Sequence, residues 1–448
     1  RDGVGRSLTS AWRDSPRVLV ISGETGQGKT WTLASLALNA ALDLALVLWV
    51  DATGDAAHDI ELAAKQFWLD IRGGETTLGL RQIADRLDNV LPNSPKQRLR
   101  VCMDNVTDYG EAATIVRDGW PSLGVSIAMS CPQEIAASLA QAFPDRVQVF
   151  TTEDFTWEEL HEFLERKLGP AWTSIPEDVR GTLKRPLLAS IYCDELFDAS
   201  WQATNEYELY GAFWKRLTTR HQVSSPLDSV AIESLADAVL RGEPYPWTLT
   251  QLGGHGVDNQ SLARLERCGW LARTADGRVA IYHDRLLNWA VAQSLYGALR
   301  SKKRTLEDVT TQVAQVSKAD GRMGNVFLGY VAMDLLWLLT GDRDPAPQAA
   351  PKLLEALEPA YGHRPEVLYR QLAPTLGERV ADSLFERFRQ YEGSPWVLRA
   401  MANALAEIAK HKICEFSQTL LSDREPRQQR RALFLLKRVP CPALLDQI

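Results

Sequence analysis

The stretch that most constrains this chain lies near its amino end. An apolar run at 18–21 leads into Gly23-Glu24-Thr25-Gly26-Gln27-Gly28-Lys29-Thr30, the complete GxxxxGKT pattern of a phosphate-binding loop, or P-loop. Glycine permits backbone conformations in which successive N–H groups face one anion, and bulkier residues would obstruct them. The helix expected at 31–42 directs its positive end to the same point. The pattern therefore predicts a strand, a P-loop and a helix.

The side chains of this loop predict the ligand. Lys29 supplies a mobile positive charge for the β- and γ-phosphates of a nucleotide, and the Thr30 hydroxyl is placed to bind Mg²⁺. We therefore expect ATP or ADP with Mg²⁺. The residues expected to contact the nucleotide in this stretch are Gly23, Glu24, Thr25, Gly26, Gln27, Gly28, Lys29, Thr30 and Trp31.

A second apolar run, 99–104, ends in a carboxylate. In a P-loop fold this strand is expected beside the first strand, with its aspartate binding the metal through water, so Asp104 is the second predicted metal-binding residue. Hydrolysis also needs a group that orients water. Asn105 cannot accept a proton, which makes Asp108 the better catalytic candidate beside Lys29 and Asp104. A helix cap or a solvated acid is an equally good interpretation of Asp108.

The remainder of this region alternates between strand and helix patterns. Continuous apolar strands separated by helices are typical of a doubly wound parallel sheet, with ligands at the carboxyl ends of the strands. We expect strands at 46–51, 123–129 and 147–150, and helices at 57–71, 79–91 and 133–142. The predicted fold class is an α/β P-loop domain at 1–152.

Composition limits the partners. Of the 448 residues, 45% are hydrophobic and 24% are charged, as in globular proteins, and the formal net charge is -7. An acidic balance disfavours nucleic acid as the main ligand, because binding it usually requires a basic surface. The one possible membrane span, 31–50, is interrupted by Asn39 and Asp43, so we expect no membrane segment.

The cysteines predict the redox environment. None of them forms a CxxC pair and they lie far apart, so we expect free thiols in a reducing compartment, without disulfides or a zinc site. A cytoplasmic location follows. The six positions are Cys102, Cys131, Cys193, Cys268, Cys414 and Cys441.

Short helices follow the sheet. Thr156 and Glu159 form a capping-box pattern that predicts a helix to about residue 168, and Pro186 is tolerable in the first turn of another helix. In many ATPases such helices form a lid over the nucleotide. We therefore expect a helical lid at 153–203.

The next segment has the pattern of a winged-helix domain, at 204–300. Helices are expected near 227–241 and 258–268, and an Asp-Gly turn at 276–277 predicts a hairpin after them. The second helix is nearly charge-balanced, which favours a structural or interaction role over DNA binding. Its charged residues are Asp258, Arg264, Glu266 and Arg267.

The carboxyl-terminal segment, 301–448, is predicted to be all-α. Pro395 and Pro426, 31 positions apart, each open a helix, and the two helices share residue types at matching offsets. This spacing indicates an α-solenoid of HEAT or TPR-like repeats. Basic residues between Arg424 and Arg438 are expected to form a solvated face, with a partner-binding patch as the alternative.

The order of these parts resembles the STAND class of signal-transducing P-loop NTPases, which includes the NACHT and NB-ARC switch proteins and bacterial antiviral proteins. The P-loop is common to the whole superfamily. The narrower likeness lies in Lys184-Arg185-Pro186-Leu187-Leu188 and in Tyr282-His283-Asp284-Arg285-Leu286-Leu287. It extends over residues 1 to about 300.

The resemblance implies further contacts with the nucleotide. Val4 and Arg6 match the segment that lies against the adenine base, and Pro186 matches the lid proline that packs on base and ribose. His283 matches the winged-helix histidine that contacts the β-phosphate of ADP in the closed state. A helix cap or a core histidine is the alternative for His283.

Two departures from the family pattern affect hydrolysis. Thr107 stands where NACHT members usually have an acid, and Ser130-Cys131 where many relatives have arginine. The likeness therefore implies nucleotide binding with slow hydrolysis rather than fast turnover.

The function that the resemblance implies is an ATP/ADP-dependent switch in innate immunity. ADP holds the chain shut, and a protein trigger such as a phage protein opens it for self-assembly. A constitutive AAA-like motor or loader is the alternative, and a scaffold that holds nucleotide for stability is a third reading. No effector chemistry is visible in the sequence.

Overall fold

The structure is a computed structural model. It describes residues 8, 12, 17–43, 45–52, 55–72, 82, 99–118, 125–197, 205–218, 226–274, 277–316, 322–323, 326–341, 349–361 and 366–447. The chain divides into two compact units, Arg1–Leu209 and Tyr210–Ile448. The division into four domains, at 1–152, 153–203, 204–300 and 301–448, stays a prediction.

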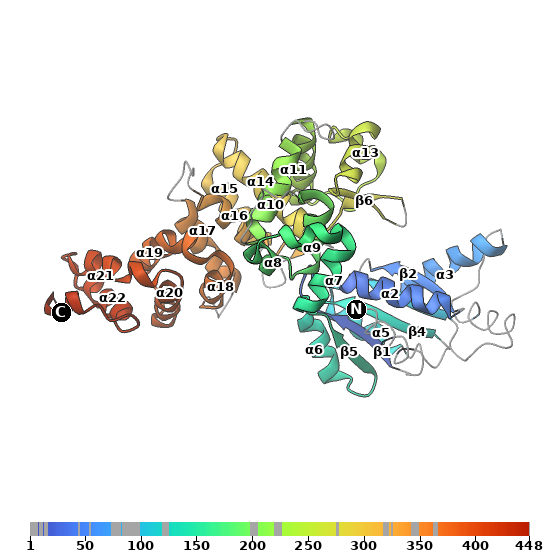
Figure 1. The fold of residues 1–448 in the computed structure, drawn as a ribbon, viewed down its shortest axis with the longest axis horizontal. Helices are drawn as coiled ribbons and strands as arrows, with labels where there is room; N and C mark the ends of the chain where they lie inside the picture. Colours follow the sequence, from blue (N-terminus) through green and yellow to red (C-terminus); the bar gives the residue numbers. More distant parts are fainter. Residues whose placement is uncertain are drawn as a thin grey trace. The chain divides into compact units, whose positions relative to one another are not determined.

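A parallel five-stranded sheet is the centre of the first unit (Figure 1). Its strands are β1 (Val18–Ser22), β2 (Leu46–Asp51), β3 (Leu99–Asp104), β4 (Val125–Cys131) and β5 (Val147–Thr151). Their spatial order is β2-β3-β4-β1-β5. The expected α/β P-loop fold is thereby confirmed. The expectation that the strand of Asp104 lies beside the first strand is wrong, because β4 pairs with both β1 and β3.

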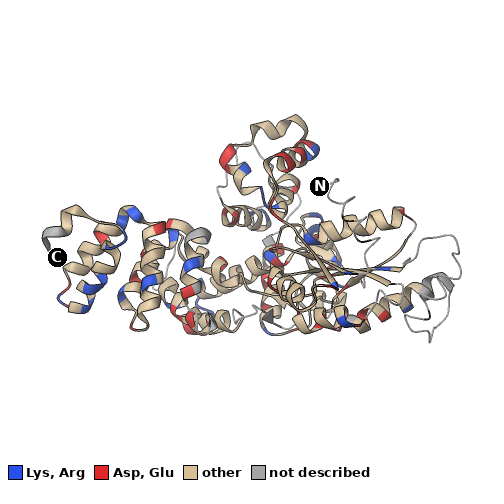
Figure 2. Ribbon diagram, turned by 90° about the horizontal axis from the view of Figure 1, so that it is seen from below, with Lys and Arg blue, Asp and Glu red and all other residues tan. Residues whose placement is uncertain are grey.

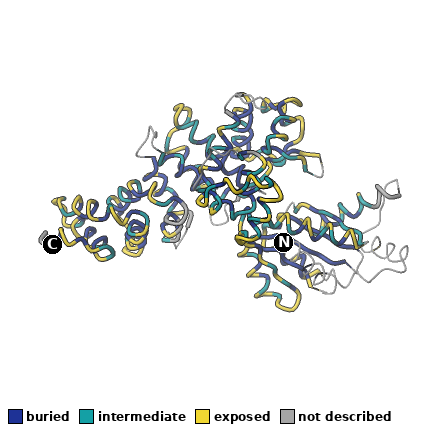
Figure 3. Tube along the Cα trace, viewed as in Figure 1, coloured by how far each residue is buried: buried dark blue, intermediate teal, exposed yellow. Residues whose placement is uncertain are grey.

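Helices cover both faces of this sheet, as alternation along β1 requires. Val18 and Val20 pack into a core with α3 (Ala56–Arg72), α5 (Tyr109–Arg117) and α6 (Gln133–Ala142). Leu19 and Ile21 pack on the other face against α2 (Lys29–Leu42). The buried strands are dark blue in Figure 3. The helix expected at 79–91 lies outside the described residues.

The expected short helices follow β5. They are α7 (Trp157–Leu168), η2 (Gly169–Ser174), α8 (Glu177–Thr182), α9 (Pro186–Ile191) and η3 (Tyr192–Leu196). Thr156 and Glu159 form both bonds of the predicted capping box, and Pro186 is the first residue of α9. Helix α10 (Glu206–Thr218) begins in the first unit and ends in the second.

The second unit begins with helices and one hairpin. The helices are α11 (Pro226–Leu240), α12 (Leu249–Gly254), α13 (Asn259–Arg267) and α14 (Asp284–Arg300), and the hairpin is β6 (Leu271–Arg273) with β7 (Val279–Ile281). Trp270 is fully buried and stacks on Phe213 with ring centroids 4.8 Å apart. Helix α12 is absent from the expectations, because Gly253 and Gly254 weaken its pattern.

The remaining elements are nearly all helical. They are α15 (Leu306–Val316), β8 (Arg322–Met323), β9 (Val326–Phe327), α16 (Val331–Leu339), α17 (Ala349–Leu357), η4 (Glu358–Tyr361), α18 (Glu366–Leu376), η5 (Gly377–Val380), α19 (Ala381–Gln390), α20 (Pro395–Ile408), η6 (Lys410–Lys412), α21 (Ile413–Leu421), α22 (Pro426–Leu436) and η7 (Pro442–Gln447). Helix α20 contacts both α18 and α22, and α17 contacts both α15 and α19. Each of these helices thus packs against the helix two places before it and the helix two places after it in the chain. Stacked helix pairs have this pattern of contacts.

A buried ion pair joins α14 to this helical array. Arg285 donates from Nη1 and Nη2 to the two carboxylate oxygens of Asp334 on α16, at 2.7 and 2.9 Å, and both side chains are 0% exposed. The guanidinium lies over the rings of Tyr210 and Tyr330. Asn288 of α14 adds hydrogen bonds to the backbone of Phe327 and Tyr330. The contact between α14 and α16 is therefore a polar one that is buried from solvent.

The basic residues of α22 do not all form a solvated face. Arg431 is 3% exposed, and its guanidinium donates to the carbonyls of Arg389 and Tyr391 at the carboxyl end of α19. Arg427 also donates to Tyr391 O and pairs with Glu392. These side chains cap α19, because helix carboxyl ends present unsatisfied carbonyls. Figure 2 shows blue and red segments interspersed along these helices.

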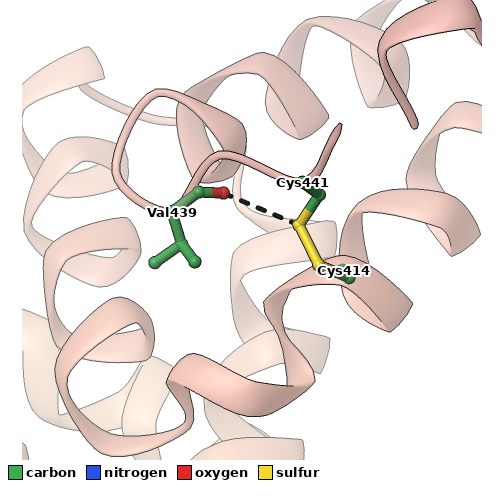
Figure 4. Close-up of a disulfide and its surroundings, with 3 residues drawn as sticks. All are labelled: Cys414, Val439 and Cys441. Carbon is green, nitrogen blue, oxygen red and sulfur yellow. Dashed lines mark hydrogen bonds between the residues drawn. A yellow bond between two sulfur atoms is a disulfide. The ribbon is translucent and has the colours of Figure 1, made fainter. Parts of the chain in front are cut away.

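One pair of cysteines corrects the expectation that every thiol is free. Cys414 on α21 and Cys441 after α22 form a disulfide (Figure 4). The carbonyl oxygen of Val439 lies 3.7 Å from Cys441 Sγ. Cys102, Cys131, Cys193 and Cys268 are free, as expected. Among the described residues no helix is both long and apolar enough to cross a membrane.

Candidate functional site

The P-loop connects β1 to α2 in the conformation that its glycines predict. Gly23 and Gly26 have φ values of +153° and +87°, which L side chains rarely adopt. A Cβ added at Gly23 would lie 2.8 Å from the carbonyl oxygen of Thr152. A Cβ at Gly26 would lie 3.2 Å from Arg185 Cδ. The loop is thus closely covered on its outer side by segments from elsewhere in the unit.

Lys29 is bound to its own loop. Its Nζ donates to Gly23 O at 2.9 Å and to Glu24 O at 3.0 Å. Thr30 is exposed in the first turn of α2, and Trp31 after it is 72% exposed. Lys29 therefore has the position from which a P-loop lysine reaches an anion, and it must release these carbonyls to do so.

Asp104 is held by a residue that sequence reasoning did not select. Ser130 Oγ, at the carboxyl end of β4, donates to Asp104 Oδ1 and accepts from the N–H of Asn105 at 3.0 Å. Asn105 has φ +59°, so the chain turns sharply directly after Asp104. Both Ser130 and Asp104 are buried. Ser130 therefore fixes the carboxylate of Asp104 from the end of the neighbouring strand.

The site has a second carboxylate at the same sheet edge. Asp51, the last residue of β2, is the register partner of Asp104, and the N–H of Ala52 donates to Asp104 O at 3.0 Å. Carboxyl ends of parallel strands meet at one edge of a sheet, which explains the proximity. Asp51 was read only as a strand end, because nothing in the sequence shows which strands are neighbours.

Asp108 has a structural task in this structure. Its Oδ1 accepts from the N–H of Glu111 at 2.8 Å, so the side chain caps α5. This is one of the two interpretations left open by the sequence. Its role in orienting water stays a prediction.

The segment before α9 contacts the P-loop directly. The N–H of Leu187 donates to Gly26 O at 3.1 Å. Arg185 Nη2 donates to Glu24 Oε2 at 2.9 Å. Pro186 lies between these two residues, at the first position of α9. The structure therefore brings Pro186 to the edge of the loop, while its contact with a base stays a prediction.

The sequence analysis did not predict the contacts that Thr152, Asp154 and Arg185 make around the loop. Thr152 donates from N and from Oγ1 to Ser22 O, at 2.7 and 3.0 Å. Gln27 Nε2 donates to Asp154 Oδ1 at 3.2 Å. Arg185 appeared in the sequence analysis only as part of a family motif. Its partners are far apart in the chain, so no local pattern could predict the pairing.

His283 caps a helix in the second unit. Its Nδ1 accepts from the N–H of Arg285 at 3.1 Å, at the start of α14. A neutral imidazole that accepts at Nδ1 carries its proton on Nε2. The cap was the alternative interpretation of this residue, and its contact with a phosphate stays a prediction. Val4 and Arg6 lie outside the described residues.

The cysteines beside the site are unreactive by environment. Burial raises the pKa of Cys131 to about 12, although Lys29 acts to lower it. Burial likewise raises the pKa of Cys102 to about 12. Neither thiol is a nucleophile near neutral pH, because the thiolate is the reactive form.

No protein-family model matches the chain. No curated protein matches it in sequence. Among solved structures, the chain is similar to a Signal Transduction ATPase with Numerous Domains (STAND) protein with a tetratricopeptide repeat sensor from Pyrococcus horikoshii, with a TM-score of 0.40, 14% identity, and coverage of 97% of this chain and 70% of that chain.

The chain is also similar to a solved structure of Drosophila ORC bound to GC-rich DNA and Cdc6. This match has a TM-score of 0.27 and 9% identity, and it covers 97% of this chain and 68% of that chain. Both TM-scores lie below 0.5. The assignment of the fold therefore rests on the strand order and P-loop geometry of this chain.

Proposed function

We propose that this chain is an ATP/ADP-dependent switch of the STAND type, related to NACHT and NB-ARC proteins. One observation carries the proposal. The P-loop is covered by the α9 segment through a backbone hydrogen bond from Leu187 to Gly26 and an ion pair from Arg185 to Glu24. A loop that binds phosphates and is bonded to a separate helix can link ligand state to the position of that helix.

The residues present fit Mg²⁺ with a nucleotide. Gly23, Gly26 and Gly28 hold the loop in positive-φ conformations, and Lys29 Nζ lies within hydrogen-bond distance of two carbonyls of the same loop. Thr30 and Asp104 provide the hydroxyl and carboxylate oxygens that Mg²⁺ prefers, and Ser130 orients the latter. When bound, the metal neutralises phosphate charge. Asp108 is the candidate for orienting water, with slow hydrolysis.

In this proposal the two segments that follow the sheet also contact the nucleotide. Residues 153–203 form the lid, and 204–300 form a winged helix whose His283 donates from Nε2 to the β-phosphate of ADP. The geometry of His283 supports this, because its Nδ1 is already an acceptor within the helix cap. One donor reaching phosphate from another domain ties that domain's position to the nucleotide. Pro186, Val4 and Arg6 contact base and ribose.

A protein trigger fits the second unit better than nucleic acid. On α13, Arg264 pairs with the buried Asp228 at 2.8 Å, and Glu266 pairs with Arg273 at 2.9 Å. Asp258 caps the helix through the N–H of Ser261. The charges of Asp258, Arg264 and Glu266 are thus satisfied within the unit, and the exposed Arg267 donates to Ala263 O. One exposed arginine makes a poor basic surface for DNA. The helical array at 301–448 would read a phage protein in cytoplasmic anti-phage defence.

Switching sets an energetic requirement. Moving a population from 1:99 to 99:1 takes about 5.5 kcal/mol of differential affinity. A charge-assisted hydrogen bond contributes roughly 1.5–3 kcal/mol. Lys29, His283 and the metal contacts therefore suffice only together, and no single side chain can be the whole switch.

Size measurement of the full-length protein with ADP, and then with a non-hydrolysable ATP analogue, tests the proposal. We expect a monomer with ADP and assembly with the analogue once the trigger is present. Lys29→Ala should abolish nucleotide binding, because it removes the mobile charge. Lys65→Ala is the matched control, since Lys65 pairs on the surface with Glu61.

His283→Ala separates the switch from the alternatives. We expect it to retain nucleotide binding, release ADP faster and assemble more readily. Unchanged ADP release and assembly in this variant would refute the role of His283. Steady multiple turnover without any change of assembly would instead favour a motor, and tight binding without hydrolysis or assembly would favour a scaffold.

A further inference from the structure

Arg185 lies at the meeting point of the P-loop, the exit of β5 and the α9 segment. Each of its guanidinium nitrogens faces a different carboxylate. Nη2 is 2.9 Å from Glu24, Nη1 is 3.5 Å from Glu206, and Nε is 3.8 Å from Asp154. The side chain is only 21% exposed. One cation therefore serves three acids that come from three distant parts of the sequence.

Glu24 connects this cation to the lysine of the P-loop. Its carboxylate is bound by Arg185, and its backbone carbonyl is bound by Lys29 Nζ at 3.0 Å. Its N–H donates to Gln27 Oε1 at 2.8 Å, and Gln27 Nε2 donates to Asp154. Asp154 in turn faces Arg185, which closes a ring of polar contacts around the outside of the loop. A change at Lys29 is thus passed to Arg185 through a single residue.

Phosphates in the loop must disturb this ring. Lys29 has to release Glu24 O to reach them, and the added negative charge repels the Glu24 carboxylate. Arg185 is then left to pair more strongly with its remaining acids, since a guanidinium has several donors in a fixed fork. One of those acids, Glu206, lies in the first turn of α10, the helix that continues into the second unit.

We propose that Arg185 is a positioning residue that couples phosphate occupancy of the P-loop to the start of helix α10, by exchanging its pairing between Glu24 and Glu206. This inference rests on the proposed nucleotide-binding function and adds the route by which occupancy leaves the site. Arg185 acts through Glu24 and Glu206, and it touches neither phosphate nor metal.

Hydrogen exchange of the full chain, with and without ADP, tests the coupling at the first two turns of α10. In the wild-type protein we expect nucleotide to change exchange there by about tenfold. Arg185→Gln should still bind ADP, with Kd altered by no more than about tenfold, because a partly exposed ion pair contributes little. The exchange of α10 in this variant should be the same with and without nucleotide.

Two further variants separate coupling from simple support. Arg185→Lys retains the charge but cannot face three acids at once, so it should keep the wild-type affinity for ADP and still lack the response of α10. Lys184→Gln removes a neighbouring charge that lies over the Trp157 ring, 4.2 Å from its centroid, and should behave as wild type. If Arg185 only stabilises α10 and does not respond to nucleotide, Arg185→Gln should instead raise the exchange of α10 equally with and without ADP.

The results that overturn the inference are distinct from those that overturn the function. A nucleotide response of α10 that persists in Arg185→Gln, or that is lost equally in Lys184→Gln, refutes the role of Arg185. A wild-type chain that binds ADP without any response at α10 refutes the coupling alone. A wild-type chain that binds no nucleotide refutes the proposed function and this inference together.

Discussion

Replacing Asp334 by Asn tests the buried joint between α14 and α16. Both members of the Arg285–Asp334 pair are fully buried, and two charge-assisted bonds of 2.7 and 2.9 Å connect them. Removing one partner of a buried pair leaves an uncompensated charge and costs about 3–5 kcal/mol. Asn still accepts one bond, and the rings of Tyr210 and Tyr330 remain over the guanidinium, so we expect about 3 kcal/mol.

Native-state hydrogen exchange is the suitable assay, because a chain with two units need not unfold in a single step. A loss of about 3 kcal/mol should speed exchange of α14 and α16 by more than about a hundredfold. The double variant Arg285→Met/Asp334→Leu should lie much closer to wild type, since an apolar pair can replace a buried ion pair.

A surface pair provides the control for this experiment. Arg166 and Glu162 are 65% and 61% exposed, so Glu162→Gln should change local stability by less than about 1 kcal/mol. The reasoning is refuted if Asp334→Asn changes exchange of α14 and α16 by less than about tenfold. It is also refuted if the apolar double variant is as unstable as the single one.

Two further predictions concern the cysteines. Cys414→Ser should destabilise α21 and α22 by about 3.5 kcal/mol in oxidising buffer, from the entropy of closing a loop with a sequence separation of 27, whereas Cys268→Ser should not. Thermal unfolding of the wild-type protein, measured with and without reductant, checks this. An unfolding temperature that reductant does not change would contradict it. Burial raises the pKa of Cys102 and Cys131 to about 12 from an ordinary 9.0. Their contribution to stability is therefore complete below pH 9 and is lost as pH rises toward 12. Mass spectrometry should find both thiols unalkylated by iodoacetamide at pH 9, and rapid labelling of folded protein would count against it.

Local signals predicted the elements of the fold well. The P-loop, the capping box at Thr156 and the helix starts at Pro395 and Pro426 each depend on a few adjacent residues, and the structure has the expected element at each. The apolar strands and their parallel sheet followed from length and composition of the runs. Such features are encoded within about one turn of helix or one strand.

Long-range pairing was beyond the same reasoning. The strand of Asp104 was placed next to β1, but β4 is inserted between them, and its Ser130 became the partner of the carboxylate. Strand order depends on the packing of whole helices, so it cannot be predicted from the apolar sequence of a single strand. The ring around Arg185 and the disulfide were missed for the same reason, since their members are separated by many residues.

The joint at Arg285 has a mechanical consequence for His283, two positions before it. Arg285 bonds both to the helix cap made by His283 and to Asp334 on α16, so the position of the imidazole is linked to the first helices of the array through one buried side chain. Moving α16 away from α14 would break the Arg285–Asp334 pair and leave a buried charge without its partner.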